Sequence, residues 1–183
     1  MDTGAERQAL DIASANLMRA TAFLGAGLRL PDLALAARAI EGPCRAKVLG
    51  NGLRELDRLL NILIDAVARL SAPACFDRAA FGRIRNTSNK LSMINEIMGR
   101  PSPQCERLRA IGRSRACLFY NAGIVRRGDE RDGTIMTAGW PLRAYDIGEI
   151  LSFTPNDLSE ICEFYEDLAT DLSVNSMAAL PIR

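Results

Sequence analysis

The sequence contains no histidine, and this absence excludes several common kinds of active site. Imidazole is the base in Ser-His and Cys-His nucleophile pairs, a frequent metal ligand, and the side chain whose ordinary pKa suits proton exchange at neutral pH. Any catalysis by this chain would therefore need a different general base, and a histidine-bound metal is excluded.

Lysine is scarce as well, since Lys47 and Lys90 are the only two and every other basic side chain is an arginine. The planar guanidinium suits bidentate binding of phosphate better than an ammonium group does. A GC-rich genome also favours arginine, and we attribute most of the bias to that cause. The net charge of +1 gives no overall attraction to nucleic acid or membrane, but residues 100–131 hold eight arginines and only three acidic residues.

The five cysteines form no metal-binding or disulfide pattern. They are widely spaced, odd in number and include no Cys-x-x-Cys pair, which predicts reduced and mostly buried thiols, as in a cytosolic protein. Long apolar runs are missing too, and Met1–Arg7 has neither the basic start nor the apolar core of a signal peptide. We therefore expect a cytoplasmic protein with no membrane partner. No phosphate-binding glycine loop is present, and we expect no cofactor.

Helical periodicity is the main pattern that is present, and it predicts a mainly α fold. A chain of 183 residues, about half of them hydrophobic, is long enough to bury a core. We expect a helical bundle of about five to six helices as a single domain at residues 1–175, with a loose tail at residues 176–183. The expected helices cover Ala5–Leu28, a short segment from Pro31 to Glu41, Pro43–Leu70, Phe76–Met98, Pro103–Phe119 and a last helix after Thr154.

The helix expected at Pro43–Leu70 carries a stripe of leucines at three- and four-residue spacing. Such a stripe suits a bundle core or a dimer seam, and we favour the core. Gly50 and Gly52 near its start indicate a break or a kink. The last helix has the clearest start, because Thr154 is a suitable cap and Pro155 suits the first helical position. Its second face is acidic, and we expect that face to be solvated or to oppose an arginine-rich neighbour.

Residues 124–140 interrupt the helical pattern. A polar segment, Gly128–Gly133, separates the short apolar pieces Ile124–Val125 and Ile135–Met136. This arrangement predicts a small hairpin or an irregular insertion.

The candidate site is Arg113–Arg127, in which arginines flank an apolar run that ends in a polar pair. The side chains expected to bind a phosphate-bearing ligand are Arg113, Arg115, Tyr120, Asn121, Arg126 and Arg127. In the alternative, structural interpretation, Tyr120 and Asn121 end a helix, Gly123 supplies a left-handed turn, and the arginines are merely exposed. We assign a second pair, Arg85 and Asn86, to a polar face of the third helix.

Cys117 lies within this arginine-rich run, which could lower the pKa of its thiol. Its neighbours Ala116 and Leu118 are apolar, and we favour a buried, inert thiol over an activated one.

The pattern Arg115-x4-Tyr120-Asn121-Ala-Gly123 resembles the signature of the HEPN superfamily, helical-bundle domains of prokaryotic toxin–antitoxin and defence systems. In many members an arginine is followed four to six residues later by His-Asn, just after a helix. The surrounding order is similar as well, with a helix and a Gly-Pro break before the motif and a well-capped final helix after it. The resemblance covers Leu91 to Leu172.

This chain departs from the family at one position, because Tyr120 stands where the family has histidine. In active members, the arginine and histidine of two protomers meet at a dimer cleft and cut RNA without a metal. The ordinary pKa of tyrosine is about 10, against about 6.5 for histidine, so Tyr120 is a poor general base at neutral pH. Lowering that pKa by about 3 units would require roughly 4 kcal/mol of stabilisation from neighbours such as Arg113 and Arg115.

The resemblance therefore implies a homodimeric domain that binds RNA or nucleotide phosphate, or that mediates assembly, with little or no catalysis. One alternative is a metal-independent ribonuclease whose catalytic residues are Arg115 and Tyr120. A second alternative is a scaffold or regulatory partner that binds another protein.

Overall fold

The computed structural model describes residues 3–26, 37–72, 76–130 and 133–178, and it confirms the mainly α fold. Six helices and one two-stranded sheet lie within these residues. The elements are α1 (Thr3–Ala26), α3 (Pro43–Ser71), α4 (Arg78–Arg83), α5 (Thr87–Ile97), α6 (Gln104–Asn121), β1 (Ile135–Ala138), β2 (Arg143–Asp146) and α7 (Pro155–Ala178). The short helix expected from Pro31 falls mostly outside the described residues, and residues 37–41 are not helical.

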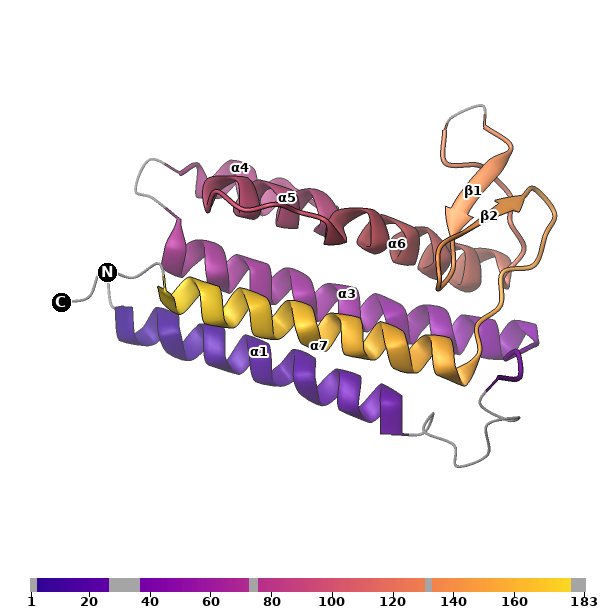
Figure 1. Cartoon of the computed structure of the whole chain (residues 1–183), viewed down its shortest axis with the longest axis horizontal. Helices are drawn as coiled ribbons and strands as arrows, with labels where there is room; N and C mark the ends of the chain where they lie inside the picture. The colour runs from indigo at the N-terminus through magenta and orange to yellow at the C-terminus, as the bar shows by residue number, and fades with distance from the viewer. Residues whose placement is uncertain (1–2, 27–36, 73–75, 131–132, 179–183) are drawn as a thin grey trace.

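Helix α3 is the central element of the bundle. It packs against α1 and α7 on one side and against α5 and α6 on the other (Figure 1). Most of its leucine stripe, including Leu53, Leu60 and Leu63, is fully buried against these helices of the same chain, and Leu59 and Leu70 are partly buried. The stripe is therefore a bundle core and not a dimer seam, because each apolar side chain already has its partners within one subunit. Buried apolar residues of all six helices and of β1 join in one cluster.

Gly50 does not break α3, so the expected break is absent and that part of the prediction is wrong. The helix runs without interruption from Pro43 to Ser71. A β-carbon on Gly50 would lie 2.8 Å from the backbone nitrogen of Phe119 on α6. The glycine is required for the close approach of two helices, which is a packing role that local helix propensity does not reveal.

The single helix expected at Phe76–Met98 is two helices, α4 and α5, which is a second correction. Asp77 caps α4, since its side chain accepts a hydrogen bond from the Ala80 backbone. Asn86 caps α5 in the same way through the backbone of Asn89. Arg85 and Asn86 therefore form a helix start and not a polar helix face, because an asparagine side chain can satisfy an N–H group that a new helix leaves free.

A hairpin exists near the predicted insertion, but its strands differ from those expected. Strand β1 pairs antiparallel with β2, which follows it directly along the chain. Ile124 forms an isolated bridge with Ile150 instead of pairing with Ile135. The short connection at residues 139–142 costs less chain entropy than the longer loop that the sequence pattern suggested.

Helix α7 begins as predicted and ends later than predicted. The Thr154 hydroxyl accepts from the backbone of Asp157, and the Asp157 carboxylate accepts from the backbone of Thr154, which is a reciprocal cap. The helix then continues to Ala178, so residues 176–178 are not part of a loose tail; residues 179–183 lie outside the described part. Ser176 is buried and donates to the carbonyl of Leu172, which ties this last turn to the helix.

The α7 residue Tyr165 is fully buried, and its hydroxyl makes no hydrogen bond with any described residue. Burial raises the pKa of Tyr165 well above its ordinary value, the nearby Asp57 carboxylate raises it further, and Arg115 opposes both effects. An unsatisfied buried hydroxyl costs about 1–3 kcal/mol. We therefore expect Tyr165→Phe to raise the free energy of unfolding by about 1 kcal/mol at pH 7, measured by urea denaturation.

The same substitution should change the dependence of stability on alkaline pH. The unfolded chain releases the phenol proton of Tyr165 near pH 10, whereas the folded protein keeps it. The contribution of this difference to the free energy of unfolding is therefore fully present below about pH 10 and is lost as the pH rises above it. Above pH 10, the free energy of unfolding of Tyr165→Phe should fall less steeply than that of the wild type, by up to about 1.4 kcal/mol per pH unit. Tyr120→Phe, at an exposed position, is the control. Equal alkaline slopes for the wild type and Tyr165→Phe would contradict this assignment.

Candidate functional site

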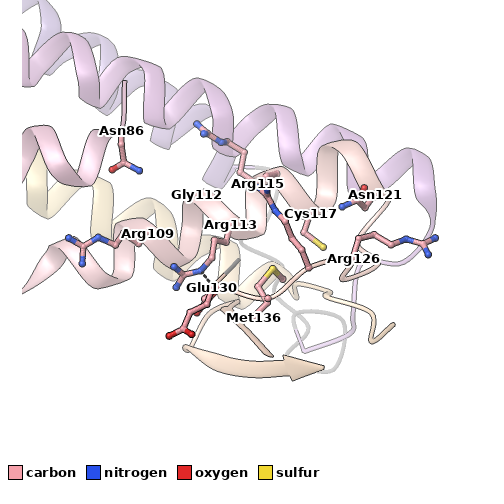
Figure 2. A pocket seen from close by; sticks show the side chains of 14 residues that line it. Asn86, Arg109, Gly112, Arg113, Arg115, Cys117, Asn121, Arg126, Glu130 and Met136 are labelled. Atoms are coloured by element: carbon pink, nitrogen blue, oxygen red, sulfur yellow. Dashed lines mark ion pairs between the residues drawn. The ribbon is translucent and has the colours of Figure 1, made fainter. Parts of the chain in front are cut away.

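A pocket of about 620 Å³ lies beside α6, at the end of the bundle that carries the hairpin (Figure 2). It is lined by the second half of α6, by the segment that follows it, by the cap of α5 and by β1. Five of its lining residues are arginines, namely Arg109, Arg113, Arg115, Arg126 and Arg127. Among the described residues, the acidic ones in the lining are Asp129 and Glu130.

The pocket contains five of the six predicted binding residues and excludes the sixth, Tyr120. Arg109, Asn86 and Glu130 also line the pocket, although they were not among the predicted binding residues. Arg109 lies one helical turn before Arg113, so the helical spacing of the predicted helix was a signal for including it. No such local signal exists for Asn86, because it comes from α5 and meets α6 only in the tertiary structure.

Arg113 connects α6 to the hairpin. Its Nε atom lies 2.9 Å from Oδ1 of Asp129 and also donates to the carbonyl of Thr137 in β1. The second oxygen of Asp129 accepts from the backbone N–H of Thr137 at 3.0 Å. The hydrogen bond that Arg113 makes to a described residue uses Nε, so its two terminal nitrogens make no hydrogen bond within the described part of the chain.

Ser114, the residue after Arg113, makes a second connection to the same hairpin. Its buried hydroxyl donates to the Ala110 carbonyl and accepts from the backbone N–H of Gly139 at 2.8 Å. The hairpin wall of the pocket is therefore held to α6 by an ion pair and by a buried hydrogen bond.

Arg115 projects from α6 in a different direction from Arg113 (Figure 2). Its NH1 atom forms an ion pair with Asp57 of α3. About a third of the Arg115 side chain is exposed, so the pair holds the arginine in place without removing it from solvent. Arg115 therefore lines the pocket, but the Asp57 carboxylate already neutralises part of its charge.

Arg109, Arg126 and Arg127 differ from these two because they are exposed and form no ion pair with any described residue. The acidic lining residue Glu130 also forms no ion pair with a described residue. The pocket therefore has an excess of positive charge that its own carboxylates do not neutralise, and free guanidinium groups are suited to phosphate oxygens.

The end of α6 matches the structural interpretation of residues 120–123. Asn121 is the last helical residue, and its carbonyl accepts from the backbone of Ile124. Ala122 and Gly123 both have positive φ, and Gly123 donates to the Cys117 carbonyl, which closes the helix. A β-carbon at Gly123 would lie 2.7 Å from the Leu151 carbonyl oxygen. The glycine therefore fixes where the chain leaves α6 to form the wall that carries Arg126.

Cys117 is buried at the wall of the pocket, and burial raises the pKa of its thiol to about 11. The thiol is therefore protonated and unreactive at neutral pH, as expected, because only the thiolate is a nucleophile. Cys105 and Cys162 are buried as well, whereas Cys44 is exposed.

We expect iodoacetamide at pH 8 to modify Cys44 in the native protein and to leave Cys117 unmodified over the same period. Only about one in a thousand Cys117 thiols is ionised at that pH, and the side chain is also shielded. Peptide mapping by mass spectrometry separates the sites, and the urea-unfolded protein is the control in which both react. Native labelling of Cys117 at the rate of Cys44 would contradict this burial.

Tyr120 lies outside the arginine pocket, with 75% of its surface exposed. It packs edge-to-face on Phe119, with ring centroids 4.9 Å apart, and its hydroxyl makes no hydrogen bond with a described residue. The two aromatic rings line a separate hollow of about 250 Å³ with Arg54, Arg115 and Ala116. Arg115 and Tyr120, the two candidate catalytic residues, are therefore neighbours around this hollow.

In the part of the chain that the structure describes, no three Cys, Asp or Glu side chains gather in a way that could hold a metal ion. Of the helices described, none combines the length and apolarity that crossing a membrane requires.

Comparisons with protein-family models, curated proteins and solved structures gave no match for this chain. The resemblance to the HEPN superfamily therefore remains a prediction from the motif.

Proposed function

We propose that this chain is a phosphate-binding helical domain that takes RNA or a nucleotide in the arginine pocket, with little or no catalysis. Its role, following the resemblance, is in a prokaryotic defence or toxin–antitoxin system, as a homodimer. The observation that carries the proposal is the group of Arg109, Arg126 and Arg127 around one concave space, free of ion pairs to described residues. Exposed guanidinium groups in a concave site are the common protein donors to phosphate oxygens.

Three features support binding over cleavage. The chain has no histidine, Tyr120 lies outside the pocket, and Arg115 is paired with Asp57. A general base must reach the proton that it removes, within hydrogen-bond distance or through one water. Among the described residues of the pocket, a phosphate held by Arg109, Arg126 and Arg127 has no such base other than the carboxylates of Asp129 and Glu130, and a carboxylate is ordinarily a weak base at neutral pH.

The direct test is the binding of a labelled 12-nucleotide RNA, followed by fluorescence anisotropy at increasing salt. We expect affinity to fall steeply with salt, because phosphate contacts release counterions. The double variant Arg126→Ala/Arg127→Ala should bind at least about tenfold more weakly and show a salt slope lower by about 1–2. Arg19→Ala, which removes an exposed arginine of α1, is the matched control and should bind like the wild type.

No binding of RNA or nucleotide at 50 mM salt would refute the proposal. If Arg126→Ala/Arg127→Ala and Arg19→Ala lose the same amount of affinity for RNA, the RNA binds outside the pocket.

A second candidate, a metal-independent ribonuclease, is favoured by one observation, the shared hollow of Arg115 and Tyr120. RNA cleavage that persists in the presence of a chelator and is lost in Tyr120→Phe would support that candidate over simple binding. Retained cleavage in Tyr120→Phe would exclude Tyr120 as the proton-transferring group.

A further inference from the structure

The hollow beside Tyr120 has a composition different from that of the arginine pocket. Two aromatic rings and two guanidinium groups line it, from Phe119, Tyr120, Arg54 and Arg115. Exposed aromatic rings next to cations are the usual elements of proteins that bind single-stranded nucleic acid, because bases stack on the rings while cations contact the phosphates.

Phe119 holds this aromatic surface in place. Its backbone lies directly against Gly50 of α3, where no β-carbon intervenes. Lys47 and Arg54, one turn before and one turn after Gly50, sit 5.5 and 5.9 Å from the centre of the Phe119 ring. The phenyl ring is thus fixed by contacts to α3, and it supports Tyr120 from one edge at an interplanar angle of 86°.

Tyr120 is consequently an exposed ring with little freedom to collapse onto the surface. An aromatic side chain that is three-quarters exposed loses the benefit of apolar burial unless a ligand covers it. A base stacking on the phenol would supply that cover and would require no hydrogen-bond readout.

The hollow and the arginine pocket are adjacent. Arg115 and Ala116 line both of them, so the two spaces lie on either side of the same turn of α6. A single phosphate group can use the arginine pocket but offers no base to the hollow. A chain of at least two nucleotides can place phosphate among the arginines and a neighbouring base on Tyr120.

We propose that the ligand of this site is a single-stranded oligonucleotide, one of whose bases stacks on Tyr120 while its backbone phosphates lie in the arginine pocket. This inference rests on the proposed function and narrows it to a ligand class. A duplex is a poor fit, because its base faces are already stacked and are not available to the ring. Stacking on Tyr120 requires only the exposed face of a base, so single strands of RNA and of DNA are both expected to bind.

The experiment compares four probes by anisotropy or by competition: 12-nucleotide single strands of RNA and of DNA, a duplex of the same sequence, and inorganic tripolyphosphate. Four variants are used, namely Arg126→Ala/Arg127→Ala, Tyr120→Ala, Tyr120→Phe and Phe23→Ala. The last removes an exposed aromatic ring from α1 and is the matched control. Thermal unfolding of each variant confirms that it is folded.

Tyr120→Ala should weaken both single strands by about tenfold, which is the order of effect of losing one stacked base. Tyr120→Phe should stay within about twofold of the wild type, because a phenyl ring still stacks. Phe23→Ala should have no effect. Tripolyphosphate should bind Tyr120→Ala as it binds the wild type and should bind Arg126→Ala/Arg127→Ala more weakly, since it uses the arginines alone.

The outcomes separate this inference from the function on which it rests. If tripolyphosphate and single strands depend on Arg126 and Arg127 but Tyr120→Ala changes neither, the stacking subsite is refuted and phosphate binding stands. Duplex binding as tight as single-strand binding would overturn the preference for single strands. If no probe binds the wild type, the phosphate-binding function fails and the stacking subsite fails with it.

Discussion

Replacing Gly50 by alanine is expected to lower the free energy of unfolding by about 3 kcal/mol, the upper end of the usual cost of overpacking. The added β-carbon would lie 2.8 Å from the nitrogen, 3.0 Å from the α-carbon and 2.9 Å from the β-carbon of Phe119. These are backbone or backbone-attached atoms, so no side-chain rotation relieves the contact. Helices α3 and α6 must separate, and the gap loses dispersion contacts between them.

Urea or thermal denaturation measures this effect, and a fall of about 10 °C in Tm is expected for a chain of this size. Gly82→Ala is the matched control, because a β-carbon on Gly82 of α4 meets nothing within 4 Å. That substitution should leave stability unchanged or raise it by up to about 1 kcal/mol. Similar losses in the two variants would show that the contact between Gly50 and Phe119 is not the cause.

The Gly50 contact also connects stability to the site. Phe119 and the two residues after it form the end of α6, next to the arginine pocket and the aromatic hollow. A shift of this end would move Tyr120 relative to Arg54. We therefore expect Gly50→Ala to weaken single-strand binding even at temperatures where the protein remains folded.

Removing the carboxylate of Asp65 is expected to cost about 3 kcal/mol, the lower end of the range for breaking a buried ion pair. The partner of Asp65 is Lys90 of α5, whose side chain is only 4% exposed and whose Nζ lies 2.7 Å from Oδ1 of Asp65. The ammonium group also donates to Asn61 at 3.1 Å and lies 5.2 Å from the centre of the Phe81 ring. Asp65→Ala leaves that charge buried with an amide and a ring as its only described partners. We use the lower end because a third of the Asp65 side chain is exposed.

A double-mutant cycle tests this explanation. Lys90→Met removes the buried charge and keeps most of the side-chain volume, so Asp65→Ala in that background should cost less than about 1 kcal/mol. The exposed pair of Glu55 and Arg58 is the comparison, and Glu55→Ala should change stability little, as is usual for surface pairs. Additive effects of Asp65→Ala and Lys90→Met would argue against a coupled ion pair.

This buried pair also positions part of the site. It joins α3 to α5, and the residue that caps α5, Asn86, lines the arginine pocket. The Asn61 amide adds a hydrogen bond to Thr87, the residue next to Asn86. The polar network between these helices thus fixes the α5 side of the pocket, while Arg113 and Ser114 fix its hairpin side.

The sequence by itself determined the features that depend on neighbouring residues. Helical spacing of apolar side chains predicted α1, α3, α6 and α7, and the Thr154 cap with Pro155 located the start of α7. Five of the residues in the candidate stretch also line the arginine pocket, because α6 and the turn after it carry all of them. The helix predictions succeeded since helix formation and capping depend on contacts within a few residues.

Only the tertiary structure decided the features that depend on distant residues. It assigned Gly50 to a close helix contact, divided the third helix at Asn86, and paired β1 with β2. It also paired Arg113 with Asp129 and Arg115 with Asp57, whereas Arg109, Arg126 and Arg127 form no ion pair with a described residue. Tyr120 lies on a surface outside the pocket. Ion pairing, exposure and close approach are set by which elements meet in space, and the local pattern of a helix carries no information about its partner.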